Sequence, residues 1–429
     1  MNMQTLRNAG TPDLAFGVNG RVILTIPDLP FARISAVAIG PDRKIYCVGK
    51  SDDFTDPNPT YFLGRFNDDG TEDREFGDAG FTRDAYPDAR LQQVESFTFQ
   101  PDGKILIFAT VYNKRGGLVP AFSRYDTKGR LDTTFGSLGQ TVLNIELAPP
   151  GRAAFAVDRR NVDGNAARPK GVEVLPDGKI LASHHYLFDF HQSHGLIIRL
   201  NADGKLDTDF NQIGYITVIH PDYKLNATIL RDVIVQEDGK YLGCGNVYND
   251  SDNPSSGMFV RYDTDGALDK NFGTGGFVTI TDAVRANLIE GMVLQPNRRI
   301  LGFGGTLNNV GVMVSIEPDG APNIQFNGGK PLYTGLEPDS ITTWTSATIQ
   351  KNGRIVVAGG LGVPGRADIV VARFIDAQFD REFNEQGWLR THLENGVQMA
   401  TGLTLQEDGK ILICANLPGL QVALLRYHA

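Results

Sequence analysis

Short hydrophobic segments follow one another along the chain and are separated by Gly, Pro, Asp and Asn. Residues 233–236, 240–245, 258–262 and 276–281 show the pattern, with runs rich in β-branched and aromatic residues. Such runs, bounded by turn residues, favour β-strands. No segment combines a helical hydrophobic period with capping residues. The pattern predicts an all-β protein built from units of four strands, here named A to D.

Two motifs repeat along the chain in phase. The first is Pro-Asp-Gly-Lys-Ile or a close variant, and its basic residues are Lys44, Lys104, Lys179, Lys240, Arg299, Arg354 and Lys410. The second is Asp-x-x-Phe followed by Gly or Asn, with Phe16, Phe76, Phe135, Phe210, Phe272, Phe326 and Phe383. Gly and Asn tolerate a positive φ better than other residues. A tight turn over a buried Phe is therefore predicted in each repeat.

Tandem four-stranded antiparallel units are the signature of a β-propeller, and seven repeats predict seven four-stranded blades. The last repeat ends with its third strand, within residues 422–429, whereas residues 12–26 supply a motif turn and a fourth strand. An open ring would leave unpaired strand edges. We therefore expect residues 1–429 to form a single propeller domain in which residues 12–26 complete blade seven.

The sequence of the two motifs resembles a known repeat. Gln-Pro-Asp-Gly-Lys-Ile, followed by Arg-Tyr-x-x-Asp-Gly-x-Leu-Asp-x-x-Phe-Gly, resembles the repeat of the bacterial delta-60 family over essentially the whole chain. The resemblance implies a propeller fold. It implies no catalytic residues, because the family is defined by its repeat rather than by an activity.

An Arg at the end of strand C and an Asp at the Phe turn recur together. The Arg residues are Arg65, Arg124, Arg199, Arg261, Arg373 and Arg426, and the Asp residues are Asp13, Asp73, Asp132, Asp207, Asp269 and Asp380. The fifth repeat loses both, with Ser315 and Asn323 in their places. Joint loss is expected of paired charges, since one alone would be poorly compensated. Structural ion pairs are predicted rather than a ring of ligand-binding Arg.

Charge and composition exclude several classes. With 41 Lys and Arg against 50 Asp and Glu, the net charge is −9, which disfavours nucleic-acid binding. No apolar run is long enough for a membrane span. The first residues lack the apolar core of a Sec signal peptide, so we expect a cytoplasmic protein or export by a non-Sec route. Cys47, Cys244 and Cys414 are predicted to be buried thiols, and a monomer is expected.

Antiparallel order places the A–B and C–D turns on one face, named the motif face, and the B–C and D–A connections on the other, named the variable face. Repeat three is unusual on the variable face. The spacing before it is 75 residues, and the longer D–A connection contains Arg159 and Arg160. Its B–C segment contains His184, His185, Tyr186, Asp189, His191 and His194. These residues are the candidate ligand-binding set.

Several interpretations of this set remain open. His185, Asp189, His191 and His194 have side chains that suit Zn²⁺, although they match no specific metal motif. The set also suits a metal-free binding surface or an inert loop. Two acidic B–C loops, 51–58 and 249–254, offer oxygen ligands for Ca²⁺ but lack the full calcium-loop spacing. Five aromatic residues offer a floor for a sugar or peptide, namely Tyr112, Tyr248, Phe188, Phe190 and Trp344.

The sequence thus favours a binding or scaffold module that recognises a glycan, a peptide or a protein through its variable face. The alternative is a metal-dependent lyase or hydrolase, lactonase-like, that uses the His cluster of repeat three. A self-associating surface is a third interpretation. No cofactor is expected, and a divalent ion, Zn²⁺ or Ca²⁺, is the one candidate.

Overall fold

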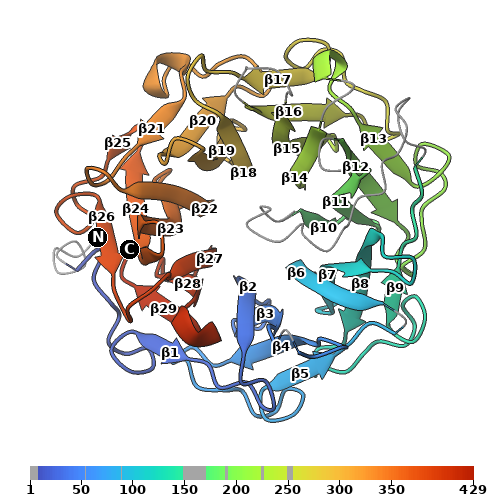
Figure 1. Ribbon diagram of the computed structural model, residues 1–429, viewed down its shortest axis with the longest axis horizontal. Coiled ribbons are helices and arrows are strands. Elements are labelled where there is room, and N and C mark those ends of the chain that lie inside the picture. Colours follow the sequence, from blue (N-terminus) through green and yellow to red (C-terminus); the bar gives the residue numbers. More distant parts are fainter. Residues whose placement is uncertain are drawn as a thin grey trace.

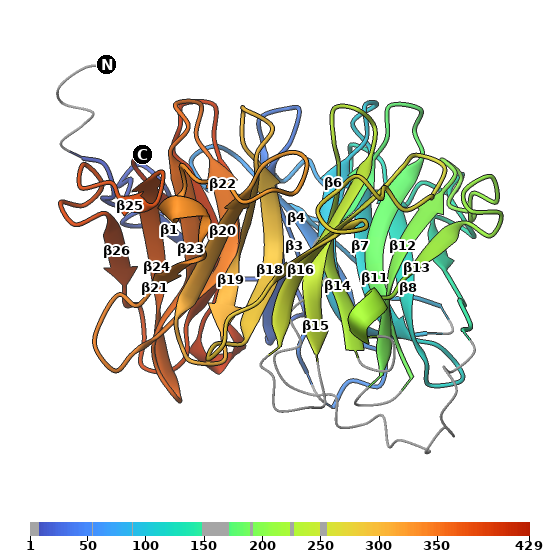
Figure 2. The same ribbon diagram turned by 90° about the horizontal axis from the view of Figure 1, so that it is seen from above.

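The computed structural model describes residues 8–53, 55–87, 89–147, 171–188, 192–223, 227–248 and 255–429. The strands stand in radial sheets around a ring, and the N-terminal strand β1 (Arg21–Ile23) lies beside the C-terminal strand β29 (Val422–Tyr427) (Figure 1). The side view shows a disc whose strands run between two loop-bearing faces (Figure 2). The fold is an all-β propeller. Among the described residues, no helix is both long and apolar enough to cross a membrane.

Each sheet places one strand at the inside of the ring and others progressively outward. The innermost strands are β2 (Ala32–Ile39), β6 (Arg90–Phe99), β10 (Val172–Val174), β14 (Ala227–Val235), β18 (Asn287–Leu294), β22 (Ile341–Ile349) and β27 (Met399–Leu405). The second strands are β3 (Ile45–Ser51), β7 (Ile105–Tyr112), β11 (Ile180–Leu187), β15 (Tyr241–Tyr248), β19 (Ile300–Thr306), β23 (Ile355–Val363) and β28 (Ile411–Asn416).

The outer half of each sheet is less uniform. The third strands are β4 (Tyr61–Phe66), β8 (Leu118–Tyr125), β12 (Ser193–Leu200), β16 (Ser256–Tyr262), β20 (Gly311–Ile316), β24 (Arg366–Ile375) and β29 (Val422–Tyr427). The outermost are β5 (Phe81–Asp84), β9 (Gln140–Val142), β13 (Tyr215–Val218), β17 (Phe277–Ile280), β21 (Leu332–Thr334), β26 (Trp388–Thr391) and β1 (Arg21–Ile23), and β25 is Gln378–Phe379. Three short 3-10 helices are Pro221–Tyr223, Asn327–Gly329 and Pro418–Leu420.

The prediction of seven four-stranded blades is wrong. The described strands form five separate blades, four with four strands and one, β22–β26, with five, and in addition one eight-stranded sheet. That sheet contains two antiparallel runs, β10–β13 and β14–β17, joined where Ser193 of β12 pairs in parallel with Ala227 of β14. Repeats three and four therefore share one hydrogen-bonded sheet, a joint that the repeat pattern does not reveal.

The N-terminal strand β1 pairs antiparallel with β29, in the order β1-β29-β28-β27. Backbone hydrogen bonds extend the contact, from Gly10 N to His428 O at 2.8 Å and from Asp13 N to Arg426 O at 2.9 Å. The first and last described segments thus share one sheet, and the C-terminus lies at the motif face (Figure 2).

The motif face is held together by a repeated side-chain clamp, which repeat three illustrates. Arg199 Nε donates to Asp207 Oδ2 at 2.6 Å, and Lys179 Nζ lies 2.9 Å from the same oxygen. Arg199 Nη1 also donates to the Thr264 carbonyl of the following repeat at 2.7 Å. Its guanidinium lies 4.4 Å from the centre of the Phe210 ring. One Arg therefore joins a strand, a turn, a buried ring and the next repeat.

The predicted Arg–Asp pairs are confirmed. The six distances are 2.9 Å for Arg65–Asp73, 2.9 Å for Arg124–Asp132, 2.6 Å for Arg199–Asp207, 2.7 Å for Arg261–Asp269, 2.7 Å for Arg373–Asp380 and 2.7 Å for Arg426–Asp13. In repeat five, Asn323 Nδ2 donates to Ser315 Oγ at 3.0 Å, so a neutral pair replaces the charged one. The residue after each motif Phe has a positive φ, from 48° at Asn211 to 54° at Gly136. Cys47, Cys244 and Cys414 are buried free thiols.

Candidate functional site

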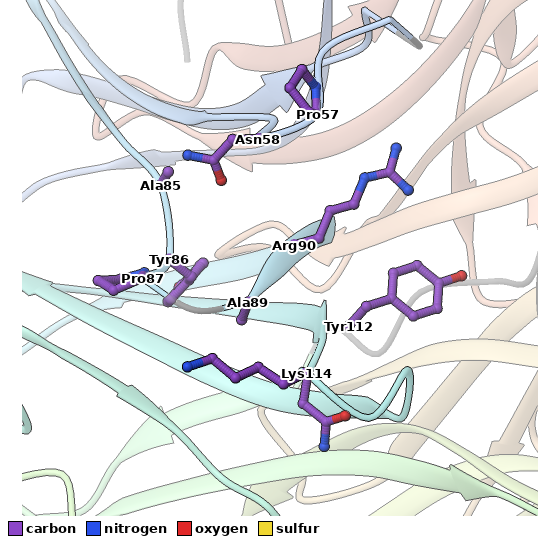
Figure 3. A pocket seen from close by; sticks show the side chains of 10 residues that line it. Pro57, Asn58, Ala85, Tyr86, Pro87, Ala89, Arg90, Tyr112 and Lys114 are labelled. Carbon is purple, nitrogen blue, oxygen red and sulfur yellow. The ribbon is translucent and has the colours of Figure 1, made fainter.

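A pocket of about 680 Å³ opens on the variable face between the first two sheets. The described residues that line it are Pro57, Asn58, Ala85, Tyr86, Pro87, Ala89, Arg90, Tyr112, Asn113 and Lys114. Three connections meet there (Figure 3): the one between β3 and β4, the one between β5 and β6, and the one between β7 and β8. The pocket exists because two neighbouring sheets bring these loops together.

The base of the pocket is rigid. Tyr86 is 1% exposed and accepts a hydrogen bond from Ser123 Oγ at 2.9 Å. Tyr61 donates to the same Ser123 oxygen at 2.8 Å, and its ring centre lies 5.2 Å from that of Tyr86. Burial raises the pKa of the Tyr86 hydroxyl well above its ordinary value, so this network stays neutral. Gln140 Nε2 adds a bond to the Ala85 carbonyl at 3.1 Å.

Positive charge characterises the rim of the pocket. Arg90 and Lys114 are exposed, and none of the described lining residues is acidic. The Arg90 and Tyr112 side chains extend toward the same side, while Lys114 extends toward Ala89 (Figure 3). Two cationic residues thus line one pocket of a protein whose net charge is −9. An anionic ligand is the chemical match for this arrangement.

Polar side chains complete the lining. Asn113 is held in its turn, because its Oδ1 accepts from Arg115 N at 3.0 Å and from Gly117 N at 2.9 Å. Its Nδ2 donates to Asn144 Oδ1 at 2.9 Å. Asn58 is exposed, and its backbone N–H donates to Asp56 Oδ1 at 2.8 Å. The turns that present Asn58 and Lys114 are therefore fixed by side-chain hydrogen bonds.

Repeat three places its described histidines on two adjacent strands. His184 and His185 lie on β11, and His194 on β12 pairs directly with Tyr186. Because side chains alternate along a strand, His184 and Tyr186 share one face of the sheet with His194, whereas His185 belongs to the other. The rings of His184 and His185 still stack, with centres 5.5 Å apart. Burial lowers the pKa of His184 to about 4.

An aromatic cluster forms on the His194 side of this sheet. The ring centre of Phe188 lies 4.8 Å from that of Tyr186 and 4.8 Å from that of His194. Burial lowers the pKa of His194 below its ordinary value. These rings pack together at the end of the β11–β12 hairpin, which is on the variable face.

The proposed metal set is only partly described. Asp189 and His191 lie outside the described residues, as do Arg159 and Arg160. Within the described segments, no three His, Cys, Asp or Glu side chains come together as a metal site. The metal site of repeat three therefore stays a prediction.

The other loop predictions have mixed outcomes. Trp344 is fully buried and donates from Nε1 to Thr334 Oγ1 at 2.8 Å, so it is wrong as part of an aromatic floor. Tyr112 does line the pocket. In the acidic loop 51–58, Asp53 Oδ1 accepts from Thr55 N at 2.8 Å, which is a turn contact. The second acidic loop, 249–254, and Phe190 lie outside the described residues.

The sequence analysis favoured the variable face but did not single out Arg90 and Lys114. Both lie in the second repeat, 24 residues apart, with Arg90 at the start of β6 and Lys114 in the connection after β7. Arg90 pairs with Tyr112 across these two strands, so the register of the sheet brings Arg90 near the turn of Lys114. The available signal was the position of both residues at predicted variable connections.

Comparison with known proteins supports a β-propeller repeat family. Residues 100–135, 175–210 and 236–272 match the family described as "Domain of unknown function (DUF5122) beta-propeller". The match does not confirm the delta-60 name. No curated protein matches the chain.

Two solved structures illustrate what the fold is similar to. The Trypanosoma rangeli sialidase in complex with the inhibitor DANA is 8% identical with a TM-score of 0.42, covering 95% of this chain and 58% of that one. The polysaccharide lyase Uly1 is 9% identical with a TM-score of 0.48, covering 100% of this chain and 95% of that one. The chain therefore spans 58% of the sialidase chain, and at these identities the likeness concerns the fold alone.

Proposed function

We propose that this protein is a binding propeller that recognises an acidic saccharide through the pocket between its first two sheets. The observation that carries the proposal is the pair of cations, Arg90 and Lys114, in a hollow with no acidic residue among its described lining. The repeat architecture supplies the rigid support, and we assign it to the delta-60 type on the motifs of the sequence.

The chemistry of the lining favours a saccharide over a compact anion. Arg90 offers a planar guanidinium suited to a carboxylate or a sulfate group, and Lys114 a second positive charge. Tyr112 offers an apolar ring face together with a hydroxyl, and Asn58 an exposed amide. A pocket of about 680 Å³ has room for more than one sugar unit. An acidic peptide is the competing ligand that the experiment must separate.

The test is isothermal titration calorimetry with three probes: tetragalacturonate, maltotetraose and tetraglutamate. We expect tetragalacturonate to bind and the neutral maltotetraose not to bind, because the charge supplies most of the attraction. Affinity should fall as salt is raised, since the pocket is open to solvent. Stronger binding of tetraglutamate than of tetragalacturonate would replace the saccharide with a peptide ligand.

A matched pair of variants locates the site. Arg90→Gln/Lys114→Gln should weaken tetragalacturonate binding by at least about ten-fold, the value of one charge-assisted hydrogen bond. Lys270→Gln/Arg381→Gln removes two exposed cations from the motif face and should leave the affinity unchanged. Equal binding by the wild type and Arg90→Gln/Lys114→Gln would contradict the proposal. So would the absence of binding by every anionic probe up to about 5 mM.

A further inference from the structure

A second cationic group lies far from solvent, on an innermost strand of the eight-stranded sheet. Arg231 is 4% exposed, and in the described part of the chain its Nε and Nη1 atoms have no hydrogen-bond partner. Among the described residues, the acidic oxygen nearest to its Nε is Glu290 Oε2, which lies 3.9 Å away, beyond hydrogen-bond range. An Arg stays protonated even when it is buried. A buried guanidinium with unused donors is costly to the fold unless something accepts them.

Arg231 occupies a position that recurs around the ring. The register of β14 shifts between Leu230 and Asp232, so Arg231 is the extra residue of a β-bulge. Corresponding bulges occur in five other inner strands, and their extra residues are Ser35, Glu95, Glu290, Thr345 and Thr401. Each of the six lies nine residues before the basic residue of its own motif.

The hydroxyl members of this ring show the structural use of the position. Thr345 Oγ1 donates to the Ala400 carbonyl of the next sheet at 2.8 Å. Thr401 Oγ1 donates to the Ile34 carbonyl at 3.1 Å, and Ser35 Oγ accepts from Gln93 Nε2 at 2.9 Å. A short hydroxyl therefore suffices to link neighbouring sheets. Arg231 instead faces Glu290, the corresponding bulge residue of the next sheet, at 3.9 Å, and its Nε and Nη1 make no hydrogen bond among the described residues.

The side chain of Arg231 reaches toward the variable-face end of β15. Its side chain contacts that of Tyr248, the last residue of β15, where the strand meets the B–C connection. His185 of β11 lies near Arg231. Burial lowers the pKa of His185, and the positive charge of Arg231 lowers it further. The Nδ1 atom of His185 is buried and has no hydrogen-bond partner among the described residues. In the described part of the chain, Glu290 is the one carboxylate within 4 Å of the Arg231 guanidinium, and it accepts no hydrogen bond from Nε or Nη1.

We infer that Arg231, with Tyr248 and His185 beside it, forms a binding site for a carboxylate at the inner, variable-face end of the ring. A carboxylate there accepts hydrogen bonds from the unused guanidinium donors and neutralises their charge. The site is separate from the pocket of Arg90 and Lys114, because it is built on β11, β14 and β15. Its ligand is either a free small acid or the acid group of a sugar, and both share this chemistry.

The experiment is calorimetric titration of the full chain with sodium acetate and with sodium glucuronate, at constant ionic strength. The wild type should bind at least one of the two, and Arg231→Gln should weaken that binding by about ten-fold or more. Lys270→Gln/Arg381→Gln should bind both probes as the wild type does. In the Arg90→Gln/Lys114→Gln background, Arg231→Gln should still cause this loss, which keeps the site distinct from the proposed function. Binding of acetate and glucuronate alike indicates a free-acid site, and binding of glucuronate alone indicates a sugar acid.

Glu290→Gln provides a second variant that leaves the guanidinium in place. It removes the negative charge that lies 3.9 Å from Arg231 Nε, so it should tighten carboxylate binding several-fold. This variant decides the matter if Arg231→Gln fails to fold. Wild-type protein that binds neither probe, or unchanged affinity in both the Arg231→Gln and the Glu290→Gln variants, would overturn the inference.

Discussion

The motif face and the variable face of this propeller use charged residues in opposite ways. On the motif face, each buried Arg has an Asp partner, as in Arg199–Asp207 at 2.6 Å and Arg261–Asp269 at 2.7 Å. On the variable face, Arg90 and Lys114 share a pocket with no acidic residue among its described lining. At the inner end of that face, Arg231 Nε and Nη1 have no hydrogen-bond partner among the residues that the structure describes.

This difference separates charge that is paired within the repeat from charge that lines a pocket. The pKa of the paired, buried Asp207 shows this. Burial alone would raise that pKa, but Lys179 and Arg199 lower it by more, so the net shift is downward. Such a group is already neutralised within the chain and contributes to the stability of the fold. Arg90 lies where an outside partner must supply the opposite charge. A charged residue that recurs from repeat to repeat thus indicates a role in stabilising the fold. A charged residue that occurs in one repeat is instead a candidate for ligand binding.

The largest expected effect is on the motif-face clamp. Asp207→Ala leaves Arg199 and Lys179 facing each other without their shared acceptor, so we expect a loss of about 3–5 kcal/mol in the free energy of unfolding. Chemical denaturation followed by tryptophan fluorescence or circular dichroism measures it. A loss below about 1 kcal/mol would mean that the clamps do not hold the repeats together.

A double variant sharpens this result. Arg199→Ser/Asp207→Asn installs in repeat three the neutral pair that repeat five already has, Ser315 with Asn323. Because no unpaired Arg remains, the double variant should be more stable than Asp207→Ala, although it deletes two charges instead of one. A double variant at least as unstable as Asp207→Ala would show that the pair is not the unit of stabilisation.

A smaller effect is expected from Glu173, on the inner strand β10. Burial raises its pKa from 4.5 to about 7, with the charge of Asp232 adding to the shift and a hydrogen bond from Val235 N opposing it. The folded state then binds this proton more tightly than the unfolded state does, so stability falls as pH rises from about 4.5 to about 7. At pH 8, Glu173→Gln should exceed the wild type by about 1–2 kcal/mol.

The pH dependence is the check on this assignment. At pH 4 both proteins carry a neutral side chain at position 173, so their unfolding free energies should agree. A gap between Glu173→Gln and the wild type that is the same at pH 4 and pH 8 would rule out ionisation as its cause.

The pocket variants should affect stability least. Arg90 and Lys114 are exposed, and substitutions of exposed residues usually change the free energy of unfolding by no more than about 0.5 kcal/mol. Arg90→Gln/Lys114→Gln should therefore unfold at the wild-type denaturant concentration. A marked loss of stability would place these cations among the structural charges and remove the contrast between the two faces.

Metal content tests the histidines of repeat three independently. Strand alternation places His185 on the face of the sheet opposite His184 and His194, so we expect purified protein to retain no stoichiometric zinc. Inductively coupled plasma mass spectrometry of tag-free protein gives the answer. One zinc per chain, lost in His185→Ala/His194→Ala, would support the metal-dependent alternative instead.

The sequence predicted the propeller, the clamp and the positive φ after each motif Phe, because all three recur with a fixed local pattern. It did not predict the shared sheet of repeats three and four, since one parallel pair, Ser193 with Ala227, leaves no mark in the repeat. The sequence also emphasised a segment of eleven residues that contains four of the seven histidines of the chain. Arg90, Lys114 and Arg231 are ordinary in the sequence, and only the packing of neighbouring sheets shows what surrounds them.

The central claim is that ligands bind the variable face while the motif face supports the fold. Hydrogen–deuterium exchange measured by mass spectrometry, with and without tetragalacturonate, tests it most directly. We predict slower exchange in the segments around Asn58, Arg90 and Lys114, with no change in the motif turns at 73–77 and 132–136. Protection centred on those motif turns, or none anywhere at saturating probe, would contradict the account.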